Sequence, residues 1–432
     1  MSKNKRIAFI QRKAAVFAAA VMTVVTAVSG KGLATVMAAD EEEFTRTAIE
    51  ITEDMGNGWN LGNTMEAINT WTQNPSVSDF ETAWGQPVTT KEMITGVKNA
   101  GFDSIRIPVA WSNMMSDDGT YTIDQAYFER VDEIIGYAMD NDMYVIINIH
   151  WDGGWWDQFN TDKDEAMTRY KAMWAQIADH YKDYPEKLIF ESANEELSFG
   201  YELVNEINQE FVNLVRASGG NNDRRYLLIA GHHTDIDATC DEDFVMPEDT
   251  IENHLMISVH YYTPWIYVAL YQDEGYGYME SWGTDADKQE MESYLRKMLK
   301  FTEEGYGVVI GEYSVLPQWV SDGNYNRKDG DMEFISYLLE LCDTYGFTPY
   351  LWDAGDWYDR AECKLRWDDT VEVFQRDTSE GSQDPETEDG NVGAGDIAWA
   401  VSVILMLLPI GAVVAFSFVA AGFENKKDMY RQ

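Results

Sequence analysis

Eight short apolar runs recur along the middle of the chain, and most of the gaps between them are long enough for a helix. Runs of this length are typical of strands that are buried on both faces, as in a parallel sheet. They lie at residues 58–61, 104–108, 144–149, 188–192, 226–230, 255–260, 308–311 and 348–352. Eight buried strands that alternate with helices predict an α/β fold, the eight-stranded parallel (β/α)8 or TIM barrel.

The gaps themselves carry helical patterns. Val131, Ile134, Ile135 and Ala138 fall on one helical face, and the apolar residues of 170–181 have the same spacing. Further helices are predicted at residues 45–55, 91–100, 202–216, 285–304 and 332–345. An open, doubly wound sheet is the alternative architecture. Such sheets usually carry a Gly-x-Gly-x-x-Gly phosphate-binding turn, which this sequence lacks.

Two glutamates follow the fourth and seventh of these runs, Glu195 and Glu312. In a strand-helix barrel, catalytic groups sit at the rim where the strands end. Two carboxylates that meet there can cleave a glycosidic bond. Solvated loop positions are the alternative for each glutamate. That alternative does not explain the polar and aromatic residues that lie within or directly after the predicted strands, namely Asn63, Arg106, His150, Trp151, Asn194, His260, Tyr262 and Trp352.

Seven segments in uninterrupted order resemble glycoside hydrolase family 5. They are GWNLGNTME (58–66), ETAWGQPVTTKEMI (81–94), IRIPVAW (105–111), INIHWD (147–152), NE (194–195), HYY (260–262) and GEY (311–313). They are most similar to its subfamily 4, which contains endo-β-1,4-glucanases and xyloglucanases. The resemblance covers roughly residues 44–352. It implies a retaining barrel enzyme with its acid/base after strand four and its nucleophile after strand seven.

The resemblance also implies a set of site residues. Glu195 corresponds to the acid/base and Glu312 to the nucleophile. The substrate-binding residues carried over by motif are Arg106, His150, Asn194, His260, Tyr262 and Trp352. Loop residues Trp151 and Trp265 are expected to be stacking platforms for sugar, and Asn63, which follows strand one, is expected to bind substrate as well. The chain departs from the family pattern at Trp151, where a second His is common, at Glu196, where Pro is common, and over residues 353–376.

The chemistry requires the two glutamates to differ in protonation. Arg106 and the Tyr262 hydroxyl are expected to favour the ionised form of Glu312. Burial and the charge of Glu312 are expected to raise the pKa of Glu195, so that it starts protonated. Asn194 can hydrogen-bond the sugar 2-hydroxyl. Trp352 offers a flat face to the sugar at the cleavage site.

Both ends of the chain carry targeting patterns. A basic segment at 3–13, an apolar segment at 14–28 and small residues up to Ala39 are typical of a secretory signal. An uncleaved signal anchor is the alternative. Residues 397–423 carry no charge and are long enough to span a bilayer, which needs about 20 residues. A buried core helix is usually shorter and amphipathic. The basic residues that follow place the C-terminus in the cytoplasm.

The predicted order of segments follows from these patterns. Residues 1–39 are a signal peptide, 40–376 the barrel domain, 377–396 an acidic flexible linker, 397–423 a transmembrane helix and 424–432 a cytoplasmic tail. The expected location is the cell membrane, with a single span and an extracellular catalytic domain.

The charge and cysteine content limit the partners. A net charge of −43 repels nucleic acid and anionic lipid, and it suits a neutral polysaccharide. We therefore expect a monomer that binds β-1,4-linked polysaccharide, no nucleic acid and no cofactor. Three cysteines are too few for a disulfide framework. The adjacent pair His232–His233 fits a loop after strand five better than a metal site, because neighbouring side chains point to opposite faces.

Three other hypotheses about function remain open. A non-catalytic glycan-binding surface protein would keep the aromatic residues but has no need of both glutamates. A metal-dependent deacetylase or phosphodiesterase would need clustered His and Asp at the strand ends, where the sequence has only scattered ones. Among the hydrolases, xyloglucanase and β-mannanase are close alternatives to endo-β-1,4-glucanase, because loop shape decides which glycan is bound.

Overall fold

The computed structural model describes residues 43–375, apart from residue 70 and residues 196–198, 272–276 and 322–323. The predicted signal peptide, the predicted linker and the predicted span at 397–423 lie outside the described residues. Within the described part of the chain, no helix has both the length and the apolar character that a membrane crossing requires.

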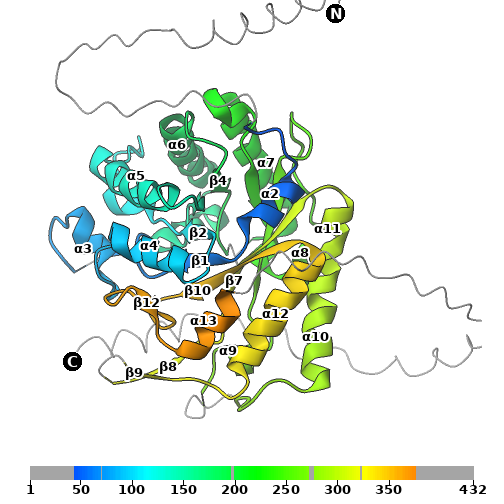
Figure 1. Ribbon diagram of the computed structural model, residues 1–432. Coiled ribbons are helices and arrows are strands. Elements are labelled where there is room, and N and C mark those ends of the chain that lie inside the picture. Colours follow the sequence, from blue (N-terminus) through cyan, green and yellow to red (C-terminus); the bar gives the residue numbers. More distant parts are fainter. Residues whose placement is uncertain (1–42, 70, 196–198, 272–276, 322–323, 376–432) are drawn as a thin grey trace, which may run out of the picture. The chain divides into compact units, whose positions relative to one another are not determined.

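Eight parallel strands close into a barrel, which confirms the predicted fold (Figure 1). In chain order they are β1 (Gly58–Leu61), β2 (Ser104–Ile107), β3 (Tyr144–Asn148), β4 (Leu188–Glu191), β5 (Leu227–Ala230), β6 (Leu255–Tyr261), β7 (Gly307–Tyr313) and β10 (Phe347–Asp353). Each strand overlaps one of the predicted apolar runs. The barrel closes between β1 and β10, where Gly58 pairs with Tyr350 and Leu61 with Asp353.

The connecting segments are largely helical, as predicted. The α-helices are α2 (Ala48–Met55), α3 (Val77–Glu81), α4 (Lys91–Asn99), α5 (Gln125–Met139), α6 (Lys163–Tyr181), α7 (Tyr201–Ala217), α8 (Ile236–Thr239), α9 (Trp265–Val268), α10 (Asp285–Leu295), α11 (Leu299–Glu303), α12 (Asp331–Tyr345) and α13 (Asp368–Phe374). Short 3-10 helices are η1 (Trp111–Met114), η2 (Asp152–Asn160), η3 (Gly220–Asp223), η4 (His232–Thr234) and η5 (Arg296–Met298). Capping boxes start α2 and α10, where Thr47 and Thr284 exchange hydrogen bonds with the third helical residue.

One connection differs from the sequence prediction, and the connection after β5 lacks a long helix. The helix expected at 285–304 is divided into α10, η5 and α11. The connection after β5, for which the sequence predicts a loop, contains the short 3-10 helix η4 and the four-residue α8. Pro247 and many acidic residues follow α8, and this segment lacks the apolar face that a longer helix would bury.

The barrel interior has an apolar floor. Helix α2 precedes β1, and its apolar face packs against inward-facing strand residues. This cluster consists of Phe44, Ala48, Ile51, Met55, Tyr144, Ile146, Ile189, Tyr226, Leu228, Met256, Val309 and Tyr350. Side chains alternate across a strand, so the next inward position lies two residues further on. Those positions on β3, β4 and β6 hold Asn148, Glu191 and Ser258, and the interior thus becomes polar toward the C-terminal ends of the strands.

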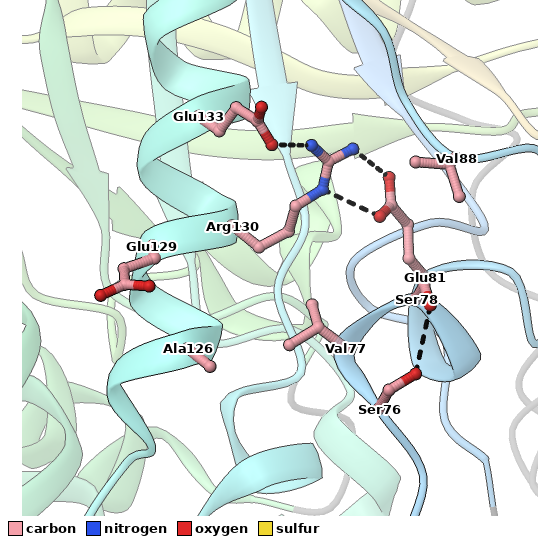
Figure 2. A pocket seen from close by; sticks show the side chains of 9 residues that line it. All are labelled: Ser76, Val77, Ser78, Glu81, Val88, Ala126, Glu129, Arg130 and Glu133. Atoms are coloured by element: carbon pink, nitrogen blue, oxygen red, sulfur yellow. Dashed lines mark hydrogen bonds and ion pairs between the residues drawn. The ribbon is translucent and has the colours of Figure 1, made fainter.

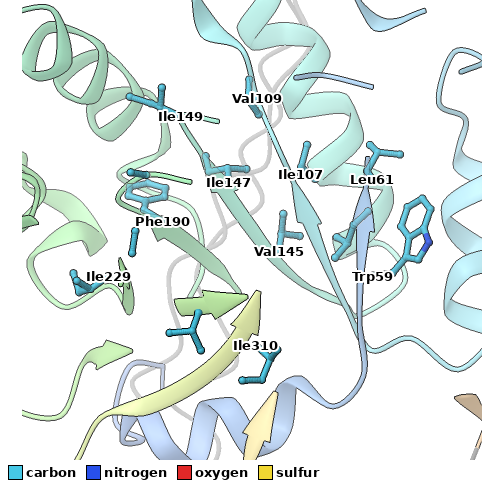
Figure 3. Packing of buried hydrophobic residues seen from close by; sticks show 14 of the residues in the cluster. Trp59, Leu61, Ile107, Val109, Val145, Ile147, Ile149, Phe190, Ile229 and Ile310 are labelled. Atoms are coloured by element: carbon cyan, nitrogen blue, oxygen red, sulfur yellow. The ribbon is translucent and has the colours of Figure 1, made fainter. Parts of the chain in front are cut away.

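The outward-facing strand residues form a second, larger core with the surrounding helices. Figure 3 shows Trp59, Ile107, Ile147, Phe190 and Ile310 among its members. All five are fully buried. A strand that is buried on both faces has no polar side and appears in the sequence as a continuous apolar run. This is why these strands could be predicted from the sequence.

Residues 353–375, which match the family pattern poorly, complete the barrel. They contain the antiparallel pair β11 (Tyr358–Asp359) and β12 (Lys364–Leu365), followed by α13. The ring of Phe374 packs 4.9 Å from that of Phe102. The Asn57 side chain donates a 3.3 Å hydrogen bond to the Phe374 carbonyl. A second antiparallel pair, β8 (Gln318–Ser321) and β9 (Asn324–Asn326), follows β7.

Gly58 provides a test of the packing inside the barrel. A Cβ atom at this position would lie 2.3 Å from the ring of Tyr350, which is fully buried. We expect Gly58→Ala to lower the free energy of unfolding by about 1–3 kcal/mol, as overpacking of a core does. Thermal unfolding followed by circular dichroism measures this change.

Gly136 is the matched control for this substitution. It lies within helix α5, and a Cβ atom there meets nothing within 4 Å. Gly136→Ala should leave stability unchanged or raise it by about 0.5–1 kcal/mol, because alanine favours the helix. A Gly58→Ala protein that melts at or above the wild-type temperature would contradict the packing described here.

Candidate active site

Glu312 faces the barrel interior because of a bulge in β7. His260 pairs with Glu312 while Val259 pairs with Ile310, so Gly311 is an extra residue in the ladder. Val309 points inward, and simple alternation would turn Glu312 outward. The bulge shifts the alternation and turns the carboxylate inward. Gly311 suits this place because a Cβ atom would lie 2.7 Å from Ser258 Oγ.

Arg106, on β2, holds the centre of the site together. Its Nη1 donates to Glu312 Oε1 at 2.8 Å and to Asn60 Oδ1 at 3.0 Å. Its Nη2 donates to Asn194 Oδ1 at 2.7 Å, and its Nε donates to Glu191 Oε2 at 2.7 Å. The guanidinium group is fully buried, so these acceptors replace water.

Glu195 lies beyond the end of β4, where it meets His260 from β6. The Nδ1 atom of His260 is 2.5 Å from Glu195 Oε1 and 3.6 Å from Glu312 Oε2. The Tyr262 hydroxyl donates to Glu312 Oε2 at 3.1 Å. The structure thus brings together six of the predicted site residues, which are Arg106, Asn194, Glu195, His260, Tyr262 and Glu312.

The protonation of this group differs from what the sequence predicts. Burial acts to raise the pKa of Glu195, but the hydrogen bond and charge of His260 outweigh burial and hold that pKa below its ordinary value. Burial raises the pKa of Glu312, against the opposing charges of His260 and Arg106. Burial acts to lower the pKa of His260, but the Glu312 and Glu195 carboxylates raise it. The predicted rise for Glu195 is therefore wrong in the resting site, because the His260 imidazole lies beside it. The predicted effect of Arg106 on Glu312 is present, but burial outweighs it and raises the pKa of Glu312.

Aromatic side chains line the rim around these groups. The rings of Trp352 and His150 are stacked, 5.9 Å apart and 9° from parallel. Trp265, on α9, is 55% exposed, and its ring lies 6.3 Å from that of Tyr262. Trp151 is 43% exposed beside His150. Asn63 adopts a left-handed conformation after β1, and its backbone N–H donates to the buried Glu66 rather than to the central network.

Sequence reasoning missed the layer below Arg106. Glu191 is fully buried and accepts hydrogen bonds from Asn148 Nδ2 and Ser258 Oγ, both at 2.9 Å, as well as from Arg106. Asn60 joins the same layer. One signal was available: Glu191 is a charged residue at the end of a buried run, and such a residue requires a partner.

His232 and His233 do not form a metal site in the part of the chain that the structure describes. Their rings stack 4.0 Å apart, and Tyr201 stacks on His232. The group with converging potential ligand atoms is Glu195, His260 and Glu312, whose atoms lie within 4.8 Å of one another. His260 lies 2.5 Å from the Glu195 carboxylate and 3.6 Å from that of Glu312, an arrangement suited to proton transfer.

Glu191→Gln tests how the buried layer affects Glu312. Removing the charge of Glu191 leaves Glu312 as the anionic partner of Arg106 in this network, so the pKa of Glu312 should fall. The acid limb of the pH profile should therefore move to lower pH. Loss of the charge-assisted hydrogen bond between Arg106 and Glu191 should lower kcat/KM on polysaccharide by about 10–100-fold.

The pH dependence of kcat/KM measures both effects. Glu202→Gln, at an exposed position on α7, removes the same charge and should change neither quantity. An acid limb of Glu191→Gln that stays at the wild-type position would show that Glu191 does not influence Glu312.

Comparison with known proteins identifies the family. The profile of the cellulase family, glycosyl hydrolase family 5, matches residues 65–357. A xyloglucan-specific endo-β-1,4-glucanase of Bacteroides ovatus is 34% identical over 72% of this chain, and the match spans 65% of that protein. Endoglucanase A of Paenibacillus barcinonensis is also 34% identical, over 72% of this chain and 83% of its own length.

Solved structures agree. A GH5-4 broad specificity endoglucanase from an uncultured bovine rumen ciliate is 33% identical with a TM-score of 0.71, over 78% of this chain and 99% of that one. The family match covers Arg106, Glu195, His260 and Glu312. The chain belongs to the cellulase family, glycosyl hydrolase family 5.

Proposed function

We propose that this chain is a retaining endo-β-1,4-glucanase that hydrolyses internal bonds of cellulose and related β-glucans. One observation carries the proposal: a carboxylate oxygen of Glu195 lies within 4.8 Å of one of Glu312. Retaining enzymes hold their two carboxyl groups about 5–5.5 Å apart, whereas inverting enzymes need about 6.5–9.5 Å to admit a water molecule. The short separation therefore supports retention.

Each residue has a definite part in the proposed reaction. Glu312, held by Arg106 and Tyr262, attacks the anomeric carbon and forms a glycosyl ester. The leaving oxygen takes the proton that Glu195 and His260 share through their 2.5 Å contact. Glu195 then removes a proton from water, which hydrolyses the ester with a second inversion.

The remaining predicted residues would hold the sugar. Because Asn194 Oδ1 accepts from Arg106, its amide nitrogen is left to donate to the sugar 2-hydroxyl. The stacked Trp352 and His150 would support the sugar ring at the cleavage site. Trp151 and Trp265, both exposed, would contact units further along the glycan, and Asn63 lies on the same rim after β1.

Xyloglucan is the alternative substrate with specific support. One relative is a xyloglucan-specific endo-β-1,4-glucanase, and one similar solved structure is that of a broad specificity endoglucanase. β-Mannan is a further alternative within the family. A non-catalytic glycan-binding role fits less well, because burial of a charged Arg106 between two glutamates serves no purpose in stacking alone.

The proposed location follows from the ends of the sequence. The basic and apolar pattern of residues 1–39 favours export. The uncharged segment 397–423 with basic residues behind it favours a single membrane span, with the barrel domain (40–376) outside the cell. The acidic segment 377–396 would join the two, and residues 424–432 would lie in the cytoplasm.

Substitution of the two glutamates tests the proposed reaction. Glu312→Gly should abolish cleavage of every substrate, since it removes the nucleophile. Glu195→Ala should still form the glycosyl ester from an aryl cellobioside with a good leaving group, because that step needs no proton. Azide should then accelerate turnover of Glu195→Ala and yield a β-glycosyl azide, which proton NMR identifies.

Peptide mapping of the trapped ester completes this test. The ester should map to Glu312. Near-normal hydrolysis of carboxymethyl cellulose by Glu195→Ala, or an ester on another residue, would refute these roles. Product analysis on carboxymethyl cellulose, mixed-linkage glucan, xyloglucan and mannan with the wild-type protein then ranks the alternative substrates.

The proposed anchor predicts a specific fractionation result. The intact protein should remain with the membrane fraction, and protease added to whole cells should release an active domain by cutting within 377–396. Immunoblots of cell and medium fractions measure both. An intact, full-length protein found in the culture fluid would count against the anchor.

A further inference from the structure

Two tryptophans from different loops meet on the rim beyond the cleavage site. Trp151 follows His150 directly, and the half-buried Trp84 comes from the loop after β1. Their rings lie 6.4 Å apart at an angle of 38°. His150 stacks on Trp352, so a row of aromatic side chains leads from the proposed cleavage site to this pair. Trp151 nevertheless remains 43% exposed, although a tryptophan is more stable when buried.

Asp152 fixes the loop that carries Trp151. Its backbone is left-handed at φ 52°, and the two glycines that follow it are also left-handed. Its carboxylate is buried and accepts from Ser112 N at 2.9 Å, Ser112 Oγ at 2.7 Å and Trp155 Nε1 at 2.8 Å. A residue other than glycine rarely keeps this conformation without such support.

Two side chains, Glu81 and Gln86, fix the loop that carries Trp84. Before it in the chain, the buried carboxylate of Glu81 accepts from Arg130 Nε at 2.9 Å and Nη2 at 2.7 Å, and from Thr89 N at 2.7 Å. Figure 2 shows the two Arg130 bonds in the wall of the pocket between α3 and α5. After it, Gln86 Nε2 donates to the Ala354 carbonyl at 2.5 Å. Ala354 follows β10, the strand that ends beside Trp352.

The loop of Trp151 is therefore held by a buried carboxylate, and the loop of Trp84 is held by a partly buried ion pair and the Gln86 contact. Trp151 stays exposed and Trp84 half-buried. A β-1,4-linked glucosyl unit has only equatorial substituents, so both faces of its ring are apolar. Such a face can cover a tryptophan and remove it from water.

We propose that Trp84 and Trp151 form an outer subsite for a β-linked glucosyl unit remote from the cleaved bond, and that Asp152 and Arg130 are positioning residues for it. This subsite rests on the proposed β-glucanase function and deepens it, since it makes the enzyme favour long chains over short ones. Hydrolysis of short substrates reports on the function, and dependence on chain length reports on the subsite.

The experiment compares two substrates, 4-nitrophenyl β-cellobioside and mixed-linkage β-glucan. Trp151→Ala and Trp84→Ala should lower kcat/KM on the glucan, mainly through KM, by about 10-fold more than on the cellobioside. Trp151→Phe keeps a ring in place and should recover most of this loss. Trp71→Ala removes another exposed tryptophan of the same loop and should leave the ratio of the two substrates at the wild-type value.

Asp152→Asn and Arg130→Lys test the positioning role. Each should raise KM for the glucan while kcat changes little, and the melting temperature shows whether the protein remains folded. If either variant does not fold, Ser112→Ala still removes a hydrogen bond to Asp152. It should raise KM for the glucan by a smaller factor, again with little change in kcat.

The outcomes separate the two proposals. A wild-type protein that hydrolyses neither substrate would refute the β-glucanase function itself. The subsite alone would be overturned if the wild-type protein hydrolyses both substrates and the tryptophan variants lower kcat/KM by the same factor on each. Variants that leave kcat/KM unchanged on both substrates would overturn it as well. A loss confined to the glucan, reversed by Trp151→Phe, would support it.

Discussion

The buried guanidinium of Arg106 constrains the upper half of the barrel. A charge that is fully removed from water is costly unless anionic and polar acceptors surround it, and removal of one partner of a buried pair typically costs about 3–5 kcal/mol. Here the four acceptors, Glu312, Glu191, Asn60 and Asn194, come from β1, β4 and β7 or from the residues directly after them. The strands must therefore close in the observed register for the charge to be satisfied. One of these bonds holds Glu312 in place for the attack that we propose.

The polar layer depends on the apolar floor beneath it. Helix α2 and the inward residues of the lower barrel exclude water, which makes each hydrogen bond above them stronger and each missing bond more costly. Glu191 lies between the two layers and links Arg106 to Asn148 and Ser258. Stability and chemistry thus share the same side chains, so substitutions in this layer should affect both.

His260 connects the two carboxylates that the proposed reaction uses. It lies within hydrogen-bond distance of Glu195 and 3.6 Å from Glu312. In the resting site the imidazole draws the shared proton away from Glu195, which lowers the pKa of that glutamate. A sugar oxygen placed beside Glu195 would change this balance. The assignment of acid and nucleophile therefore depends on the position of His260 as well as on the two glutamates.

Much of the architecture could be predicted from the sequence. Strands buried on both faces are continuous apolar runs, so all eight could be located, and catalytic groups in such barrels follow strand ends, which pointed to Glu195 and Glu312. Tertiary structure alone decided the rest. The bulge at Gly311 turns Glu312 inward, and the meeting of His260 with Glu195 reverses the expected pKa shift. Both depend on contacts between strands far apart in the chain, which local patterns of apolar and polar residues do not record.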